Sequence, residues 1–161
     1  SGTWGKQSFT NQGMRLQTNH SEGGSVFLDG TFLWKDYLFS ADIVWNAGDS
    51  FSLLARYKNN NTFLACSTND SYTSITQSLE GIEKELKRGN TNYLLRKGTK
   101  VHADMVVQGN TVQCKENGNV VVEASGFDQS LSSGGVGFKN WGQQRNQSDI
   151  LVTSISVTAL P

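Results

Sequence analysis

Hydrophobic and polar residues alternate along the chain in the stretch that follows Lys100. In Val101–Gln108 every second residue from Val101 is apolar, which is the period of a half-buried β-strand. Gly109-Asn110 then leads into Thr111–Glu116, and Asn117-Gly118 leads into Asn119–Glu123. Gly and Asn tolerate the positive φ angles that tight hairpin turns require. The pattern therefore predicts a β-meander of three strands.

The rest of the chain carries short apolar or alternating runs, each bounded by Gly, Asn, Asp or Ser, as is typical of β-strands. The segment Ser78–Arg88 also fits helical spacing, but Glu80-Gly81 between two strand-like runs favours a hairpin. About a dozen short strands without a convincing helix predict an all-β fold, namely a two-sheet antiparallel β-sandwich with jelly-roll connections. The further predicted strands are Met14–Gln17, Ser25–Leu28, Tyr37–Trp45, Ser50–Tyr57, Thr62–Ser67, Tyr72–Leu79, Ile82–Lys87, Val136–Phe138 and Asp149–Ala159.

Length and charge narrow the class of protein. A chain of 161 residues forms one domain and buries roughly 68–70% of its unfolded surface, so it needs no metal or disulfide merely to fold. The formal net charge is zero, which argues against the basic surface that nucleic acid requires. No apolar run is long enough for a membrane span. Because the chain starts Ser1-Gly2 without Met, we expect residues 1–161 to be a single module excised from a larger secreted protein.

The two cysteines allow two interpretations. Cys66 and Cys114 each lie inside a predicted strand. If they are bonded, they close a loop of about 48 residues, for which the chain-entropy model gives about 4 kcal/mol of stabilisation. If they are free, they are a pair of buried thiols of the kind common in protein cores. Two cysteines are too few to define a disulfide framework, so both interpretations stay open.

The order and spacing of several blocks carry a family resemblance. The chain resembles the concanavalin A-like, laminin-G-like sandwich modules, and among them it is most similar to carbohydrate-binding modules of glycan-degrading enzymes, including the group that contains levan binders. Each block by itself is ordinary strand-and-turn sequence, and a sandwich fold does not by itself specify a ligand. The blocks are Trp34–Tyr37, Phe39–Asp42, Leu53–Phe63, Leu79–Ile82, Val107–Val112 and Gly135–Phe138.

The resemblance implies that one sheet is concave and that ligand binds on that face or on the loops at its rim. Arg56 lies in a strand whose other face carries Phe51, Leu53 and Ala55, so we expect it to project away from the core. Its planar guanidinium can bind two adjacent hydroxyls or a carboxylate in a fixed geometry. Arg56 is therefore a predicted ligand residue, with a surface ion pair as the alternative.

Aromatic side chains are the second part of a sugar site, because the C–H face of a sugar ring packs on an aromatic plane. Trp141 follows a short strand and enters a loop rich in Gly, Gln and Asn, and we predict that it and the adjacent Asn140 contact ligand. Tyr72 begins a strand after a polar loop and is a third candidate. Trp34 is a candidate whose alternative role is to anchor the incoming strand. Glu22, in a Gly-rich turn, could accept hydrogen bonds from hydroxyls or bind calcium.

Metal-ligating patterns are scarce. His20 and His102 have no Cys or His at a zinc-binding spacing, and no acidic loop has the ligand spacing of an EF-hand. The resemblance implies that a structural Ca²⁺ at the sheet rim is possible, with Asp149 and Asp36 as candidate ligands. No motif requires a cofactor.

Catalytic patterns are equally scarce. Retaining glycosidases need two carboxyl groups about 5–5.5 Å apart, and the nearest match is Glu83 and Glu85 on one face of a strand with lysines nearby. A solvated hairpin explains that pair without catalysis. We therefore predict a protein that is not an enzyme.

Three functional classes follow. The first is a secreted, monomeric, noncatalytic carbohydrate-binding module that holds a linked glycan-degrading enzyme on its polysaccharide. The second is a laminin-G-like adhesion or protein-interaction domain, and the third is a divergent glycan-cleaving enzyme. The sequence does not identify the sugar.

Overall fold

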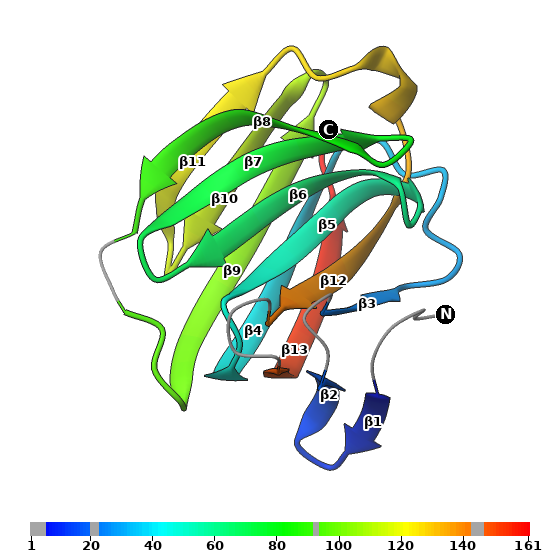
Figure 1. Ribbon diagram of the computed structural model, residues 1–161. Coiled ribbons are helices and arrows are strands. Elements are labelled where there is room, and N and C mark those ends of the chain that lie inside the picture. The colour runs from blue at the N-terminus through cyan, green and yellow to red at the C-terminus, as the bar shows by residue number, and fades with distance from the viewer. Residues whose placement is uncertain (1–5, 20–22, 92–93, 143–146) are drawn as a thin grey trace.

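The computed structural model describes residues 6–19, 23–91, 94–142 and 147–161. These residues form two antiparallel β-sheets that face each other, and Figure 1 shows the six-stranded sheet in front of the seven-stranded one. The predicted all-β, two-sheet sandwich is therefore confirmed. A single 3-10 turn, η1 (Gln129–Leu131), is the one helical element of the described residues.

Strands of the seven-stranded sheet come from both ends and from the middle of the chain. Their order across the sheet is β1-β2-β13-β4-β9-β10-β11. The last three form the predicted meander, and β13 pairs with β2 on one side and β4 on the other. The bounds are β1 Lys6–Thr10, β2 Gly13–Thr18, β4 Tyr37–Ala47, β9 Thr99–Gln108, β10 Thr111–Glu116, β11 Asn119–Ser125 and β13 Ser148–Ala159.

The six-stranded sheet has the order β3-β12-β5-β6-β7-β8, so four of its strands are consecutive in sequence. Glu80 and Gly81 both have positive φ between β7 and β8, which confirms the predicted hairpin in this segment. The bounds are β3 Gly24–Phe27, β5 Ser50–Asn59, β6 Thr62–Asn69, β7 Tyr72–Leu79, β8 Ile82–Asn90 and β12 Gly135–Trp141.

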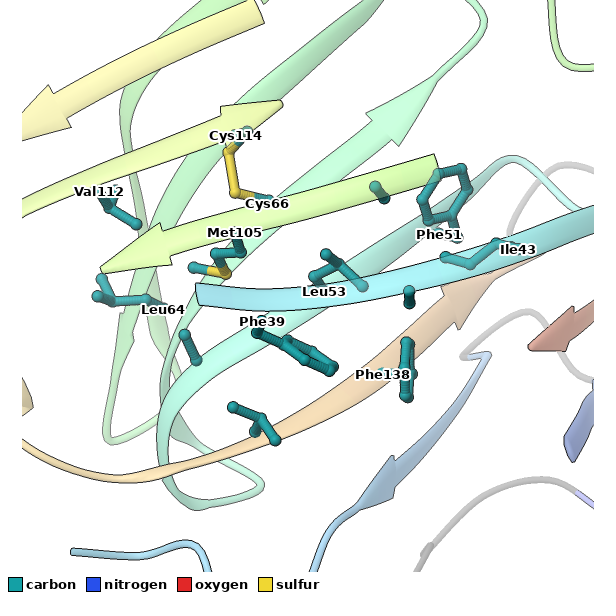
Figure 2. Packing of buried hydrophobic residues seen from close by; sticks show 14 of the residues in the cluster. Phe39, Ile43, Phe51, Leu53, Leu64, Cys66, Met105, Val112, Cys114 and Phe138 are labelled. Carbon is teal, nitrogen blue, oxygen red and sulfur yellow. A yellow bond between two sulfur atoms is a disulfide. The ribbon is translucent and has the colours of Figure 1, made fainter. Parts of the chain in front are cut away.

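Alternate residues of both sheets meet in one hydrophobic core (Figure 2). Phe39 from the seven-stranded sheet packs edge-on against Phe138 from the six-stranded sheet, with ring centroids 5.2 Å apart. Cys66 and Cys114 are bonded to each other and join β6 to β10 across the core, which decides between the two interpretations of the cysteines. The disulfide thus links the two sheets covalently.

The strand β1 was not predicted. Its five residues are exposed or half-buried, so no buried face imposes alternation on their sequence. No helix among the described residues has the length and apolar character needed to cross a membrane.

Candidate functional site

The outer face of the six-stranded sheet has a floor of small side chains. Strand register places Ser52 of β5 opposite Ser67 of β6, and Ser67 opposite Ser74 of β7. The hydroxyls of Ser52 and Ser67 are hydrogen-bonded at 2.8 Å. Because side chains alternate between the two faces of a strand, the neighbours of these serines point into the core while the serines point outward.

Larger side chains stand around this floor and leave a shallow hollow of about 70 Å³, which we call the trough. The trough combines aromatic rings, hydroxyls and one pair of opposite charges. Its lining residues are Ser52, Phe63, Ala65, Ser67, Thr76, Glu83, Lys139 and Trp141.

One contact shows that this face is concave. Lys139 Nζ lies 3.8 Å from Glu83 Oε1, although Lys139 belongs to β12 and Glu83 to β8. These strands are separated by β5, β6 and β7, which is roughly 19 Å along the sheet at the usual strand spacing. The two side chains can meet only if the sheet curves so that its edges rise on either side of the floor.

Lys139 is held in place by aromatic rings. Its ammonium nitrogen lies 3.8 Å from the ring centroid of Trp141 and 5.3 Å from that of Phe63, within the range of cation–π attraction. The side chain is 18% exposed. Burial lowers the pKa of Lys139, and the nearby carboxylate of Glu83 opposes that shift.

A second charge pair stands beside the trough on the β7–β8 hairpin. The guanidinium of Arg88 lies 3.7 Å above the ring of Tyr72 and binds the carboxylate of Glu85 at 2.6 Å. Tyr72 is on the same face as Thr76 of the trough, since both alternate with core-facing residues of β7.

Two of the predicted ligand residues, Trp141 and Tyr72, therefore lie on one face of one sheet. Their contact with a ligand stays a prediction. The sequence analysis missed Lys139, Phe63 and Arg88. Alternation in β12 carried a usable signal for Lys139, because Phe138 is buried in the core and its neighbour must face outward.

Arg56 does not project to solvent, and that expectation is wrong. Its side chain is 1% exposed. The pairing of β5 with β6 shifts between Ala55 and Asn59, and Arg56 has a φ of 50°, so the regular alternation stops here. As a result Ala55 faces the core while Tyr57 belongs to a separate apolar cluster.

The buried guanidinium of Arg56 connects loops at one end of the sandwich. It donates to the carbonyl oxygen of Leu131 at 3.0 Å and lies 3.4 Å from the carboxylate of Asp36. Its backbone N–H donates to the hydroxyl of Tyr37 at 2.8 Å. Burial lowers the pKa of Arg56 and raises the pKa of Tyr37 to about 12. The structure thus gives Arg56 a structural role.

Asn140 is also buried, contrary to expectation. It faces the core side of β12 with 0% exposure. Its amide nitrogen donates to the carbonyl oxygen of Leu16, and its amide oxygen accepts from the N–H of Gly24. Both ends of the side chain are therefore used to connect β12 to β2 and β3.

The remaining predicted ligand residues lie elsewhere. Trp34 is 38% exposed and stacks edge-on against Tyr37 in the loop before β4, with centroids 6.0 Å apart. Its ligand role stays a prediction. Glu22 lies outside the described residues.

The two candidate calcium ligands, Asp149 and Asp36, are each engaged by protein groups. Asp149 accepts hydrogen bonds from Arg15 and Gln17, and Asp36 accepts from the N–H of Gly109 at 2.7 Å and pairs with Arg56. Within the described part of the chain no group of three or more His, Cys, Asp or Glu residues is arranged to hold a metal. A calcium-binding role of these two carboxylates stays a prediction.

A larger hollow of about 670 Å³ lies on the outer face of the seven-stranded sheet, and we call it the groove. His102 dominates its polar side: Nδ1 is 2.7 Å from Asp42 Oδ1, and Nε2 is 3.3 Å from Asp104 Oδ1. The hydrogen bond with Asp42 raises the pKa of His102. The lining residues are Gln12, Asp42, Ile43, Val44, Lys100, Val101, His102, Asn117, Leu151 and Thr153.

Comparison with known proteins identifies the fold. No family model matches the sequence, and no curated protein matches it either. Among solved structures, the carbohydrate-binding module CBM66 from Bacillus subtilis superimposes with a TM-score of 0.82 at 12% identity, covering 99% of this chain and 94% of that one. The exoplasmic/lumenal domain of VIP36, bound to Ca²⁺ and Man3GlcNAc, has a TM-score of 0.77 at 12% identity, covering 100% and 85%.

The same architecture also occurs in an enzyme. Alginate lyase A1-II′, a member of polysaccharide lyase family 7, superimposes with a TM-score of 0.65 at 10% identity, covering 95% of this chain and 82% of that one. The chain thus has the concanavalin A-like β-sandwich fold, as its sequence blocks indicated.

Proposed function

We propose that this chain is a noncatalytic carbohydrate-binding module that takes its glycan in the trough. The observation that supports this most is the composition of the concave face. The ring of Trp141, the hydroxyl of Ser67 and the Lys139–Glu83 pair line one hollow, and the buried Phe63 and Ser52 form part of its floor. Rings bind the C–H faces of sugars, and polar groups beside them fix the orientation of hydroxyls.

The solved structures support the same ligand class. The carbohydrate-binding module CBM66 and the Man3GlcNAc-bound exoplasmic/lumenal domain of VIP36 share the fold. Because both structures are only 12% identical to this chain, they support the fold alone. The choice of the trough as the binding site therefore rests on the side chains that line it.

The acids at the trough support binding without catalysis. Glu83 faces Lys139, and Glu85 is paired with Arg88, so each carboxylate has a cation as its partner. Of the two histidines, His102 is the one among the described residues, and it belongs to the seven-stranded sheet, away from the trough. We infer that the module does not cleave glycans, and incubation with polysaccharides should produce no new reducing ends and no unsaturated products.

The proposed biological role is to hold a linked glycan-degrading enzyme near its substrate. Residues 1–161 would be one module of a larger secreted protein, acting as a monomer. The inter-sheet disulfide fits an oxidising compartment. Tethering raises the effective concentration of the enzyme at the glycan, so the isolated module can bind weakly and still be effective. No calcium ion is part of this proposal, because Asp36 and Asp149 are engaged by protein partners.

Calorimetric titration against fructans, β-glucans, xylans, galactans, mannans and uronic-acid polymers tests this function. We expect at least one polysaccharide to bind and Trp141→Ala to weaken that binding at least tenfold. The matched control is Leu151→Ala, which removes an apolar side chain from the groove on the other sheet and should leave affinity unchanged. Binding that is lost in Leu151→Ala and kept in Trp141→Ala would contradict the choice of the trough.

One observation favours the second candidate, a protein-interaction domain. The loop before β4 presents Phe32, Leu33 and Trp34, of which Leu33 is 86% exposed. Hydrogen bonds from Trp34 N to Thr31 O and from Gly134 N to Trp34 O fix this loop. If no glycan in the panel binds, this exposed apolar loop becomes the surface to test.

A further inference from the structure

The Lys139–Glu83 contact is too long to be a direct hydrogen bond. The nitrogen and oxygen are 3.8 Å apart, whereas an ammonium that donates to a carboxylate lies about 2.7–2.9 Å from it. Within the described residues, neither the Lys139 ammonium nor the Glu83 carboxylate makes a hydrogen bond. A donor and an acceptor therefore face the same space with unused capacity.

The two groups come from opposite parts of the sheet, and the surroundings hold Lys139 more closely than Glu83, whose side chain is 52% exposed. Lys139 is fixed over the rings of Trp141 and Phe63. Glu83 lies opposite Ser78 in the β7–β8 ladder, and the Ser78 hydroxyl is bound to the carbonyl oxygen of Asn61 at 2.8 Å. The rings therefore hold the Lys139 ammonium, and strand pairing fixes the backbone of Glu83 from which its carboxylate reaches Lys139.

A hydroxyl group can both donate and accept a hydrogen bond. Of two hydroxyls on neighbouring carbons of a sugar ring, one can accept a hydrogen bond from Lys139 while the other donates a hydrogen bond to Glu83. The small floor side chains below them, Ser52, Ser67 and Thr76, leave room for the ring.

Charge balance distinguishes neutral from acidic sugars. The cations at this face are already matched by acids, Lys139 by Glu83 and Arg88 by Glu85. A ligand carboxylate or sulfate bound to Lys139 would lie close to the carboxylate of Glu83, and like charges within about 4–6 Å disfavour each other. A neutral diol meets no such repulsion.

We propose that Lys139 and Glu83 together read two adjacent hydroxyls, so that the trough selects a neutral sugar with a free vicinal diol over a uronic or sulfated sugar. This inference rests on the proposed function, because it specifies the ligand class of the same trough.

The test uses the whole chain and the best-binding neutral polysaccharide from the panel, with a uronic-acid polymer as the acidic probe. Lys139→Met and Glu83→Gln keep side-chain size and remove the charge. We expect each to lower affinity for the neutral polysaccharide at least tenfold, since a hydrogen bond to a charged group is lost. The double variant should lose no more than about the larger single loss, as expected for two groups that act as a unit.

Glu85→Gln is the matched control, since it changes a neighbouring acid that is paired with Arg88, and it should change affinity less than threefold. Periodate oxidation, which cleaves vicinal diols, should abolish binding of the neutral polysaccharide. Glu83→Gln should also raise the affinity for the uronic-acid polymer relative to that for the neutral one.

The outcomes separate this inference from the proposed function. If Trp141→Ala abolishes binding while Lys139→Met and Glu83→Gln have no effect, the module binds glycan in the trough but the diol-reading pair is wrong. Preferential binding of the uronic-acid polymer by the unmodified chain overturns the inference in the same way. If the unmodified chain binds no glycan, both the function and the inference are overturned.

Discussion

The two sheets of this sandwich carry hollows of very different size and chemistry on their outer faces. The groove on the seven-stranded sheet measures about 670 Å³ and the trough on the six-stranded sheet about 70 Å³. No Phe, Tyr or Trp ring lines the groove within the described residues, and the imidazole of His102 is engaged by Asp42 and Asp104. The trough has two rings and a charge pair with unused hydrogen-bonding capacity.

Under the proposed function, the side chains that line a hollow, and not its volume, decide where the sugar binds. A sugar needs a ring to pack on and polar groups that are free to accept and donate. The trough provides both, whereas no Phe, Tyr or Trp side chain is among the described residues that line the groove. The curvature of the six-stranded sheet creates this arrangement, because it brings Lys139 and Glu83 together from strands that are not neighbours.

The largest loss of stability is expected when the disulfide that links the two sheets is removed. Cys66→Ala combined with Cys114→Ala opens a bond between residues 48 positions apart. We expect the free energy of unfolding to fall by about 4 kcal/mol, measured by guanidinium unfolding monitored by tryptophan fluorescence. Both faces should lose structure in a single transition. Two separate transitions in the parent protein would show that the sheets are independent units and would contradict the shared core.

The next prediction tests whether Arg56 is a structural residue or a ligand residue. Arg56→Met leaves the carbonyl oxygen of Leu131 without its donor and Asp36 without its cation. We expect a loss of roughly 2 kcal/mol in unfolding free energy, since the buried carbonyl oxygen of Leu131 is left without its donor. Glycan affinity of the folded protein should not change. Arg56→Lys, which keeps the charge but loses the planar guanidinium, is the control and should be intermediate in stability. Unchanged stability with lost binding would restore Arg56 as a ligand residue.

The Arg56 region and the trough also show which features of the structure could be predicted from the sequence. Alternation identified the sandwich and the meander, because burial of one face imposes a period of two on a strand, and the turn residues Glu80-Gly81 identified the β7–β8 hairpin. Alternation failed at Arg56, where a shift in strand pairing and a positive φ reverse the direction of the side chain. Trp141 and Tyr72 were predicted from their positions at a strand end and a strand start, and only the structure shows that they lie on one face of the six-stranded sheet. The Lys139–Glu83 contact could not be predicted, because it depends on curvature summed over several strands.

Filling each hollow in turn compares the two faces directly. Ser67→Phe places a ring on the floor of the trough, and we expect glycan affinity to fall at least tenfold, which corresponds to about 1.4 kcal/mol. Thr153→Phe places the same ring in the groove and should leave affinity unchanged. Calorimetric titration measures both, and circular dichroism checks that each variant is folded. Equal losses of glycan affinity in the two variants would contradict the choice of the trough over the groove as the binding site.

The smallest effect concerns the pH dependence of stability at the groove. The hydrogen bond with Asp42 raises the pKa of His102, so the folded state binds the proton more tightly than the unfolded state, where the pKa is about 6.5. The stabilisation is therefore fully present below that value and is lost as the pH rises through the pKa of the folded state. Because the side chain is 47% exposed, the contribution should stay below about 1 kcal/mol, as for other solvent-exposed pairs. His102→Gln should remove this dependence, so the stability difference between the two proteins should shrink from acidic to alkaline pH. Glycan affinity should not follow the same titration, since the trough lies on the other sheet, and a matching change in affinity would show that the groove takes part in binding.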